Sequence, residues 1–128
     1  MSSILLVDDD PMLLSCLEEL LVQARYTVIA RQSAADALVE VEKGTPVDLV
    51  ITDYKMSGMD GIEFLFKLRH LHPDVPAFML TGHGTLEGFL KANCLGAVDY
   101  LHKPVRARDL VRIVENALAD RKRSIIAA

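Results

Sequence analysis

The chain has 128 residues, of which 51% are hydrophobic and 25% are charged, and its formal net charge is −4. This length and composition fit one globular domain with its own core, and the charge has the wrong sign for a protein that coats nucleic acid. The spacing of the two cysteines, Cys16 and Cys94, fits neither a metal site nor a disulfide framework. Because we also find no signal segment and no membrane-length apolar run, we expect a cytoplasmic protein with reduced thiols.

The first half of the sequence predicts two strand–helix units. An apolar run at residues 4–7 precedes Asp10 and Pro11, a pair typical of a helix start, and leucines at helical spacing follow. A second run at residues 27–30 precedes Ser33, which can cap a second helix. Both runs are continuous rather than alternating, so we expect strands that are buried on both faces, as in a parallel sheet.

The second half predicts three more units of the same kind. Apolar runs at residues 47–52, 77–80 and 98–101 are each followed by helical periodicity. The expected helices carry apolar stripes that begin at Ile62, at Leu86 and at Leu110. Parallel strands joined by such crossovers form a doubly wound α/β domain with helices on both faces of the sheet. We assign residues 1–120 to this domain and residues 121–128 to a helix end, a linker or a tail.

Chemically active side chains follow four of the five expected strands. Asp8 and Asp9 come after the first strand, Asp53 after the third, Thr81 after the fourth and Lys103 after the fifth. In such a sheet these positions share one edge, where ligands bind. Crowded carboxylates favour a divalent cation such as Mg²⁺, which commonly also binds phosphate oxygens, and a lysine and a hydroxyl can contact a phosphoryl group. The set indicates an Asp nucleophile, Mg²⁺ and a phosphoryl group.

Four motifs in order, "ILLVDDD", "DLVITDYKMSGMDG", "LTGHG" and "DYLHKP", resemble the receiver domain of bacterial two-component response regulators across essentially the whole chain. The resemblance implies the CheY-like, flavodoxin-like (βα)5 fold, with five parallel strands in the order 2-1-3-4-5. It also implies a phosphoacceptor signalling domain rather than an enzyme. Such a domain takes part in its own phosphorylation and slow dephosphorylation.

The resemblance assigns the phosphoryl group to one of the aspartates. Asp53 would accept it from a sensor histidine kinase or a histidine phosphotransfer protein. Mg²⁺, or Mn²⁺, would be held by Asp8, Asp9, Asp53 and the backbone carbonyl of Lys55. From the residues themselves, we expect Asp10 to cap the first helix rather than bind the metal, because it stands directly before Pro11.

The resemblance also implies a conformational switch. Lys103 and Thr81 would contact the phosphoryl group, and Tyr100 would turn inward as Thr81 moves. The side chains of Lys55 and His83 would tune the lifetime of the phosphoryl group. The face made by the fourth helix, the fifth strand and the fifth helix would then signal to an output domain or a partner protein. That face is also where a phosphorylation-dependent homodimer would form, and we expect no direct contact with nucleic acid or membrane.

One departure from the family pattern and two rival functions stay open at this point. Ser57 stands where the family often has proline, which should loosen the turn after Asp53 without removing the chemistry. A hydrolase of the haloacid-dehalogenase type would use Asp8 and Asp10 as nucleophile and acid, but it would leave Asp53 without a role. A protein-binding module that keeps the fold without using the phosphate is the third possibility.

Overall fold

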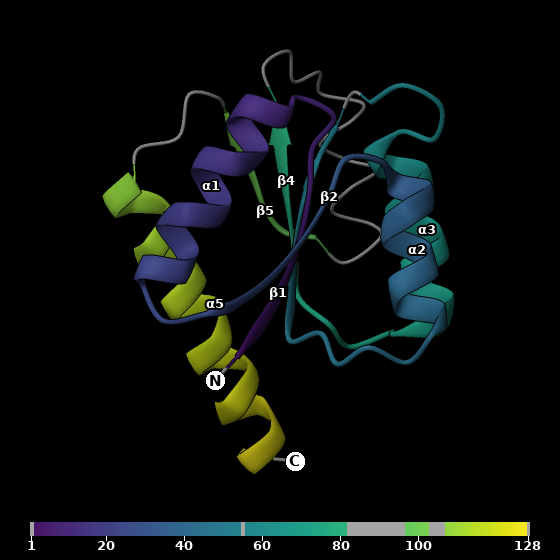
Figure 1. Cartoon of the computed structure of the whole chain (residues 1–128). Helices are drawn as coiled ribbons and strands as arrows, with labels where there is room; N and C mark the ends of the chain where they lie inside the picture. The colour runs from purple at the N-terminus through teal and green to yellow at the C-terminus, as the bar shows by residue number, and fades with distance from the viewer. Residues whose placement is uncertain (1, 55, 82–96, 103–106, 128) are drawn as a thin grey trace.

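A five-stranded parallel sheet organises the molecule. The computed structural model describes residues 2–54, 56–81, 97–102 and 107–127, with side chains described for 2–54, 56–80 and 108–119. The strand order β2-β1-β3-β4-β5 is the predicted one, and helices cover both faces of the sheet (Figure 1), so the doubly wound α/β fold is confirmed. The fourth helix, expected from Leu86 onward, lies outside the described residues. The elements are β1 (Ser3–Val7), α1 (Pro11–Gln23), β2 (Thr27–Arg31), α2 (Ala34–Glu42), β3 (Leu49–Asp53), α3 (Gly61–Leu71), β4 (Ala77–Thr81), β5 (Ala97–His102) and α5 (Ala107–Ala127).

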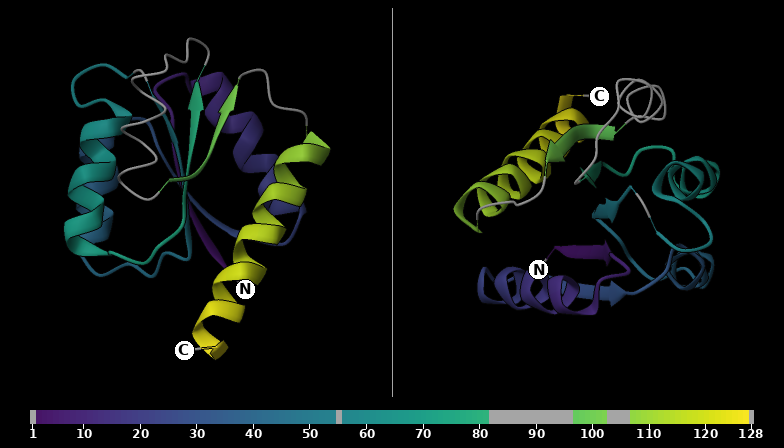
Figure 2. Two further views of the ribbon diagram at one scale, coloured as in Figure 1. Left: turned by 180° about the vertical axis from the view of Figure 1, so that it is seen from behind. Right: turned by 90° about the horizontal axis from the view of Figure 1, so that it is seen from above.

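The sheet separates two apolar clusters, each covered by a pair of helices. Figure 2 shows α1 and α5 on one face, with α2 and α3 on the other. Alternate residues of β1 point to opposite faces, so Ile4 and Leu6 pack with α1 and α5, while Leu5 and Val7 pack with α2 and α3. Because both faces of β1 are covered, its sequence reads as one continuous apolar run.

The edge strand β2 differs from the sequence expectation. The apolar run at residues 27–30 predicted a strand buried on both faces, but every residue of β2 after the exposed Thr27 is only partly buried. β2 pairs with β1 alone and stands at the edge of the sheet, so one of its sides has no neighbouring strand. A continuous apolar run therefore identified a parallel strand correctly without telling a central strand from an edge strand.

Aspartate and serine side chains cap the helices that begin near the carboxyl edge of the sheet. Asp10 Oδ1 accepts hydrogen bonds from the backbone N–H groups of Met12 and Leu13, at 3.1 and 3.3 Å. The predicted cap at Ser33 is also present, and Asp60 caps α3 in the same way. Each cap satisfies a backbone donor that would otherwise lack a partner, which contributes about 1 kcal/mol to stability.

Strand β3 begins later than the apolar pattern predicted and ends at the acid itself. The run at residues 47–52 suggested a start at Val47, but Asp48 is engaged with the start of β1. Its carboxylate accepts the Ser3 N–H at 2.8 Å, and its own N–H donates to the Ser3 carbonyl. β3 therefore runs from Leu49 to Asp53, which makes the acid the last residue of a fully buried strand.

The last helix extends well past the sheet. Residues 121–127 continue α5 (Figure 2). Within the described part of the chain, no helix combines the length and the apolar character needed to cross a membrane.

Candidate functional site

Three carboxylates converge at the carboxyl edge of the sheet. β1 and β3 are neighbouring parallel strands, with Val7 opposite Thr52, so the residues that follow them share one edge. One carboxylate oxygen from each of Asp8, Asp9 and Asp53 lies within 4.8 Å of the other two. Asp8 and Asp53 are only 1% and 6% exposed, whereas Asp9 is open to solvent. The predicted acid cluster therefore forms, with two buried members and one at the surface.

A backbone N–H group donates a hydrogen bond to each of the three carboxylates. The N–H of Asp10 donates to Asp8 Oδ1 at 2.9 Å, and the N–H of Tyr54 donates to Asp53 Oδ1 at 2.8 Å. The N–H of Ser57 reaches Asp9 Oδ2 at 3.1 Å. Hydrogen bonds of this kind stabilise and orient a charged carboxylate. They were not visible in the sequence, because any residue except proline carries the donor.

The chemistry of this donor set fits a hard divalent cation. All three side chains offer oxygen ligands, which Mg²⁺ and Mn²⁺ favour over nitrogen or sulfur ligands. Three nearby carboxylates also repel one another, and a cation between them removes that repulsion. The exposed position of Asp9 leaves the cluster accessible from solvent. The Asp cluster could thus hold a metal ion at the edge of the sheet.

The third residue of the acid triplet has a different role. The side chain of Asp10 is engaged with the first turn of α1, and Asp10 is not a member of the carboxylate cluster. The cap predicted for Asp10 is therefore confirmed. The arrangement disfavours a haloacid-dehalogenase-type site, because such a site needs the side chains of Asp8 and Asp10 to act together.

Helix α3 packs directly against the end of β3, and a glycine makes that approach possible. A Cβ atom at Gly61 would lie 2.3 Å from the Asp53 carbonyl oxygen and 2.8 Å from Met79 Sδ. The Gly61 N–H donates to the Tyr54 carbonyl at 2.8 Å, which closes the loop between β3 and α3. In the same loop, Gly58 has a φ of +80°, a conformation that L side chains rarely adopt. Both glycines thus shape the loop that borders the acid cluster.

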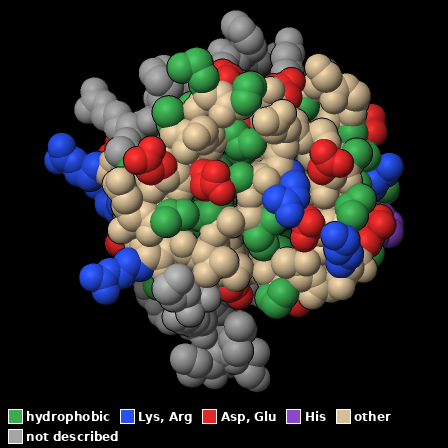
Figure 3. All heavy atoms as spheres, viewed as in Figure 1, with side chains coloured by type: hydrophobic (Ala, Val, Ile, Leu, Met, Phe, Trp, Pro, Cys, Tyr) green, Lys and Arg blue, Asp and Glu red, His purple; other side chains and the backbone are tan. Residues whose placement is uncertain are grey.

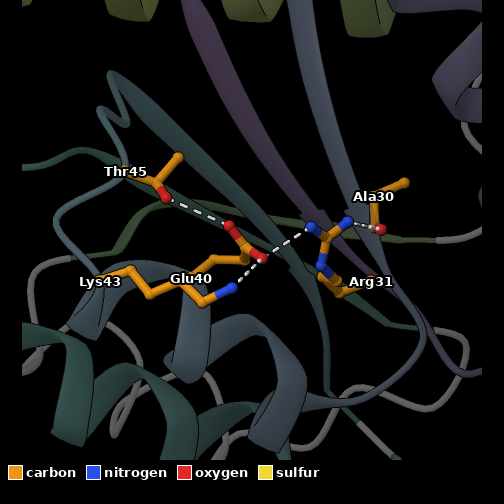
Figure 4. A network of polar contacts seen from close by, with 5 residues as sticks. All are labelled: Ala30, Arg31, Glu40, Lys43 and Thr45. Carbon is orange, nitrogen blue, oxygen red and sulfur yellow. Dashed lines mark hydrogen bonds and ion pairs between the residues drawn. The ribbon is translucent and has the colours of Figure 1, made fainter.

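The cation at the end of β2 forms an ion pair with α2. Figure 4 shows Arg31 paired with Glu40 of α2, at a Nη2 to Oε1 distance of 2.8 Å. Thr45 and Lys43 approach the same carboxylate, and Arg31 also donates to the Ala30 carbonyl. The hydrogen bond from Arg31 is the largest cause of a lowered pKa at Glu40. Arg31 therefore forms a structural ion pair that links β2 to α2.

The remaining predicted site residues are placed by backbone only or lie outside the described residues. Thr81 is the last residue of β4, and Tyr100 lies in the neighbouring strand β5, opposite Met79. The side chains of these two residues are not among those described. Lys55, His83 and Lys103 fall outside the described residues altogether.

One face of the molecule carries mixed charge. On the face seen in Figure 3, acidic, basic and hydrophobic side chains are interspersed, and the described side chains form no large basic patch there. The described side chains on this face therefore mix both signs of charge with apolar groups.

Comparison with known proteins connects this fold and this site. Residues 4–115 match the family model of the response regulator receiver domain. The transcriptional regulatory protein GlrR of Escherichia coli (strain K12) is 36% identical over 115 residues, which make up 90% of this chain and 26% of that protein. The two-component response regulator ORR23 of Oryza sativa subsp. indica is 40% identical over 116 residues, 90% of this chain and 17% of that protein. The chain therefore spans about a quarter or less of the length of these regulators.

Solved structures give the same result. A CheY-like receiver domain protein from Methanospirillum hungatei JF-1 superposes with a TM-score of 0.93 at 30% identity, covering 97% of this chain and 98% of that one. A receiver domain protein from Clostridium thermocellum gives a TM-score of 0.88 at 33% identity, covering 95% and 98%. With sheet order, acid cluster and family match in agreement, we conclude that the chain belongs to the response regulator receiver domain family of two-component systems.

Proposed function

We propose that this receiver domain accepts a phosphoryl group on Asp53 from a sensor histidine kinase, or from a histidine phosphotransfer protein, in a reaction that depends on Mg²⁺. The observation that carries the proposal is the convergence of Asp8, Asp9 and Asp53 within 4.8 Å at one edge of the sheet. Asp53 is the member that ends the central strand β3. Its side chain therefore has a rigid base, which suits a nucleophile that must be held in line with its target.

The metal would be held by Asp8, Asp9 and Asp53, with the backbone carbonyl of Lys55 as a further ligand. When bound, Mg²⁺ would neutralise the charge of the carboxylates and of the phosphoryl oxygens, which permits an anionic nucleophile to approach an anionic phosphate. The two buried acids supply ligands from a rigid part of the fold, while the exposed Asp9 leaves one side open to water and phosphate.

The transfer itself requires one bond to form and one to break. A carboxylate oxygen of Asp53 bonds to phosphorus as the bond between phosphorus and the donor's histidine nitrogen breaks, and the products are an aspartyl phosphate and a free imidazole. The Tyr54 N–H holds the Asp53 carboxylate in one orientation during the approach. We assign Lys103 to charge pairing with the phosphoryl group and Thr81 to a hydrogen bond with it. Lys55 and His83 would set how long the group persists.

The output is proposed to be a conformational change in the neighbouring strands. Thr81 ends β4 and Tyr100 lies in β5, which pairs with β4 in parallel. A movement of Thr81 toward the new phosphate would therefore act directly on the neighbouring strand β5. The added charge biases a two-state element, and the face that includes β5 and α5 would present the change to a partner or to a second phosphorylated copy.

The length of the relatives supports a role in controlling another domain or protein. Regulators such as GlrR are about four times longer than the aligned segment, so we propose that the phosphorylated domain controls an output domain or a separate partner protein in the cytoplasm. The domain itself would contact neither nucleic acid nor membrane.

The proposal is tested by intact-protein mass spectrometry after incubation with acetyl phosphate and Mg²⁺. We expect the mass of one phosphoryl group to be added to the wild-type protein and none to be added when EDTA replaces Mg²⁺. The matched control is Asp53→Asn, which preserves the shape of the side chain and removes the nucleophilic charge. Equal phosphorylation of Asp53→Asn would contradict the assignment.

A further inference from the structure

The three carboxylates of the acid cluster are held by backbone donors of very different origin. Asp53 is held by the next residue, Tyr54, and Asp8 is held by Asp10, two residues away. The donor to Asp9 comes from Ser57, which is 48 residues away in the sequence. The first two hydrogen bonds follow from local chain geometry at the strand ends. The third exists only while the loop between β3 and α3 lies over the end of β1.

Asp9 is also the carboxylate with the least support. Asp8 and Asp53 are enclosed by the fold, whereas Asp9 is exposed to solvent. Within the described part of the chain, the Ser57 N–H is the one donor that reaches the Asp9 carboxylate. An exposed aspartate without such a donor samples several rotamers, and fixing one of them costs entropy each time a metal binds.

The loop that carries Ser57 is itself held at its base. Tyr54 hydrogen-bonds both to the Leu80 carbonyl and, through its own carbonyl, to the Gly61 N–H. Between these anchors, Gly58 takes a positive φ of 80°, which turns the chain directly after Ser57. The position of the Ser57 N–H is therefore set by the loop backbone rather than by the serine side chain.

We propose that the backbone N–H of Ser57 is a positioning group for the metal ligand Asp9, and that it couples the β3–α3 loop to divalent-cation affinity in this chain. This inference rests on the proposed function of the acid cluster. A proline, which the family often carries at this position, has no N–H group and could not make the contact. Because residue 57 is serine rather than proline, this domain would have a hydrogen bond that links the β3–α3 loop to the metal ligand Asp9.

The test compares two substitutions at the same position in the full 128-residue chain. Ser57→Pro removes the N–H, whereas Ser57→Ala keeps the N–H and removes only the hydroxyl. Loss of a group that orients a metal ligand typically weakens metal binding 10- to 100-fold. Because Asp9 is one ligand of several, we expect Ser57→Pro to raise the Mg²⁺ dissociation constant about tenfold relative to Ser57→Ala, as measured by isothermal titration calorimetry. Ser57→Ala should match the wild-type protein.

The outcomes separate this inference from the proposed function. Mg²⁺ binding by the wild-type protein with equal constants for Ser57→Pro and Ser57→Ala would overturn the role of Ser57 alone. No Mg²⁺ binding by the wild-type protein would overturn the metal site and the inference together. Tenfold weaker binding by Ser57→Pro only would support both.

A second measurement keeps the inference falsifiable if Ser57→Pro does not fold. In the metal-free protein, amide hydrogen exchange of Ser57 is followed by NMR in wild type and in Asp9→Ala. We expect exchange of this one amide to be faster in Asp9→Ala, with Gly61 as the internal reference, because the Gly61 N–H donates to a backbone carbonyl instead. An unchanged Ser57 exchange rate would show that the hydrogen bond does not form in solution and would overturn the inference.

Discussion

Gly61 is the position where one added methyl group should disturb both the fold and the site. At Gly61→Ala the new Cβ would lie 2.3 Å from the carbonyl oxygen of Asp53, whereas ordinary contacts of this type begin at 3.4 Å. The two atoms must therefore separate by about 1 Å. Since the oxygen belongs to the backbone of β3, no side-chain rotation can relieve the contact, and either α3 or the end of β3 must shift.

The magnitude follows from the contacts that a shift disturbs. Overpacking a closely fitted site costs about 1–3 kcal/mol, and distortion of the hydrogen bond from Gly61 to Tyr54 adds about 1 kcal/mol. Replacing glycine lowers the conformational entropy of the unfolded chain, which stabilises the folded protein by about 0.4–1 kcal/mol. We therefore expect a net loss of about 2 kcal/mol, which corresponds to a melting temperature lowered by roughly 6–10 °C for a domain of this size.

The assay is urea unfolding followed by circular dichroism, together with a Mg²⁺ titration. Gly44→Ala is the control, because Gly44 also has a positive φ, of 84°, but a Cβ there would meet nothing within 4 Å. We expect Gly44→Ala to lose about 1 kcal/mol from backbone strain alone and to bind Mg²⁺ normally. Gly61→Ala should bind Mg²⁺ more weakly, because the backbone of Asp53 is displaced. Full stability of Gly61→Ala would refute the close-packing argument.

Three further predictions concern the acid triplet and the ion pair of Figure 4. Asp9→Ala should abolish Mg²⁺-dependent phosphorylation by acetyl phosphate, measured by intact mass. Asp10→Ala should keep that phosphorylation, and its free energy of unfolding in urea should fall by about 1 kcal/mol, because only the cap is lost. If Asp10→Ala lost phosphorylation as completely as Asp9→Ala, the separate roles of Asp9 and Asp10 would be contradicted. Arg31 lowers the pKa of Glu40 in the folded protein. The stability that Glu40 contributes is therefore fully present above its unfolded-state pKa and is lost as the pH falls through the lower folded-state pKa. Glu40→Gln should therefore be less stable than wild type at pH 7, and unfolding curves should converge in acid.

The sequence was most informative where hydrophobic burial and strand ends determine the structure. Continuous apolar runs located all five strands, and the rule that parallel strands place their ends together brought Asp8 and Asp53 to one site. Asp10 and Ser33 were also predictable, because capping depends on a side chain and its neighbours within three residues.

The features that the sequence did not reveal depend on backbone groups and on position in the sheet. The donor at Ser57 is an N–H that almost any residue would supply, so no side-chain pattern marks its contact with Asp9. The partial burial of β2 follows from its edge position. Asp48 precedes β3 because it pairs with Ser3, a partner 45 residues distant. Contacts of this range require the assembled sheet before they can be recognised.

The identity of the phosphorylated residue is the most direct test of the proposed function. Borohydride reduces an acyl phosphate to an alcohol, so an aspartyl phosphate is converted to homoserine, and peptide mass mapping then locates it. After treatment with acetyl phosphate and Mg²⁺, we predict homoserine at position 53 and aspartate at positions 8, 9 and 10. Homoserine at position 8 would indicate a hydrolase-type nucleophile instead and would contradict the assignment of Asp53 as the phosphoacceptor.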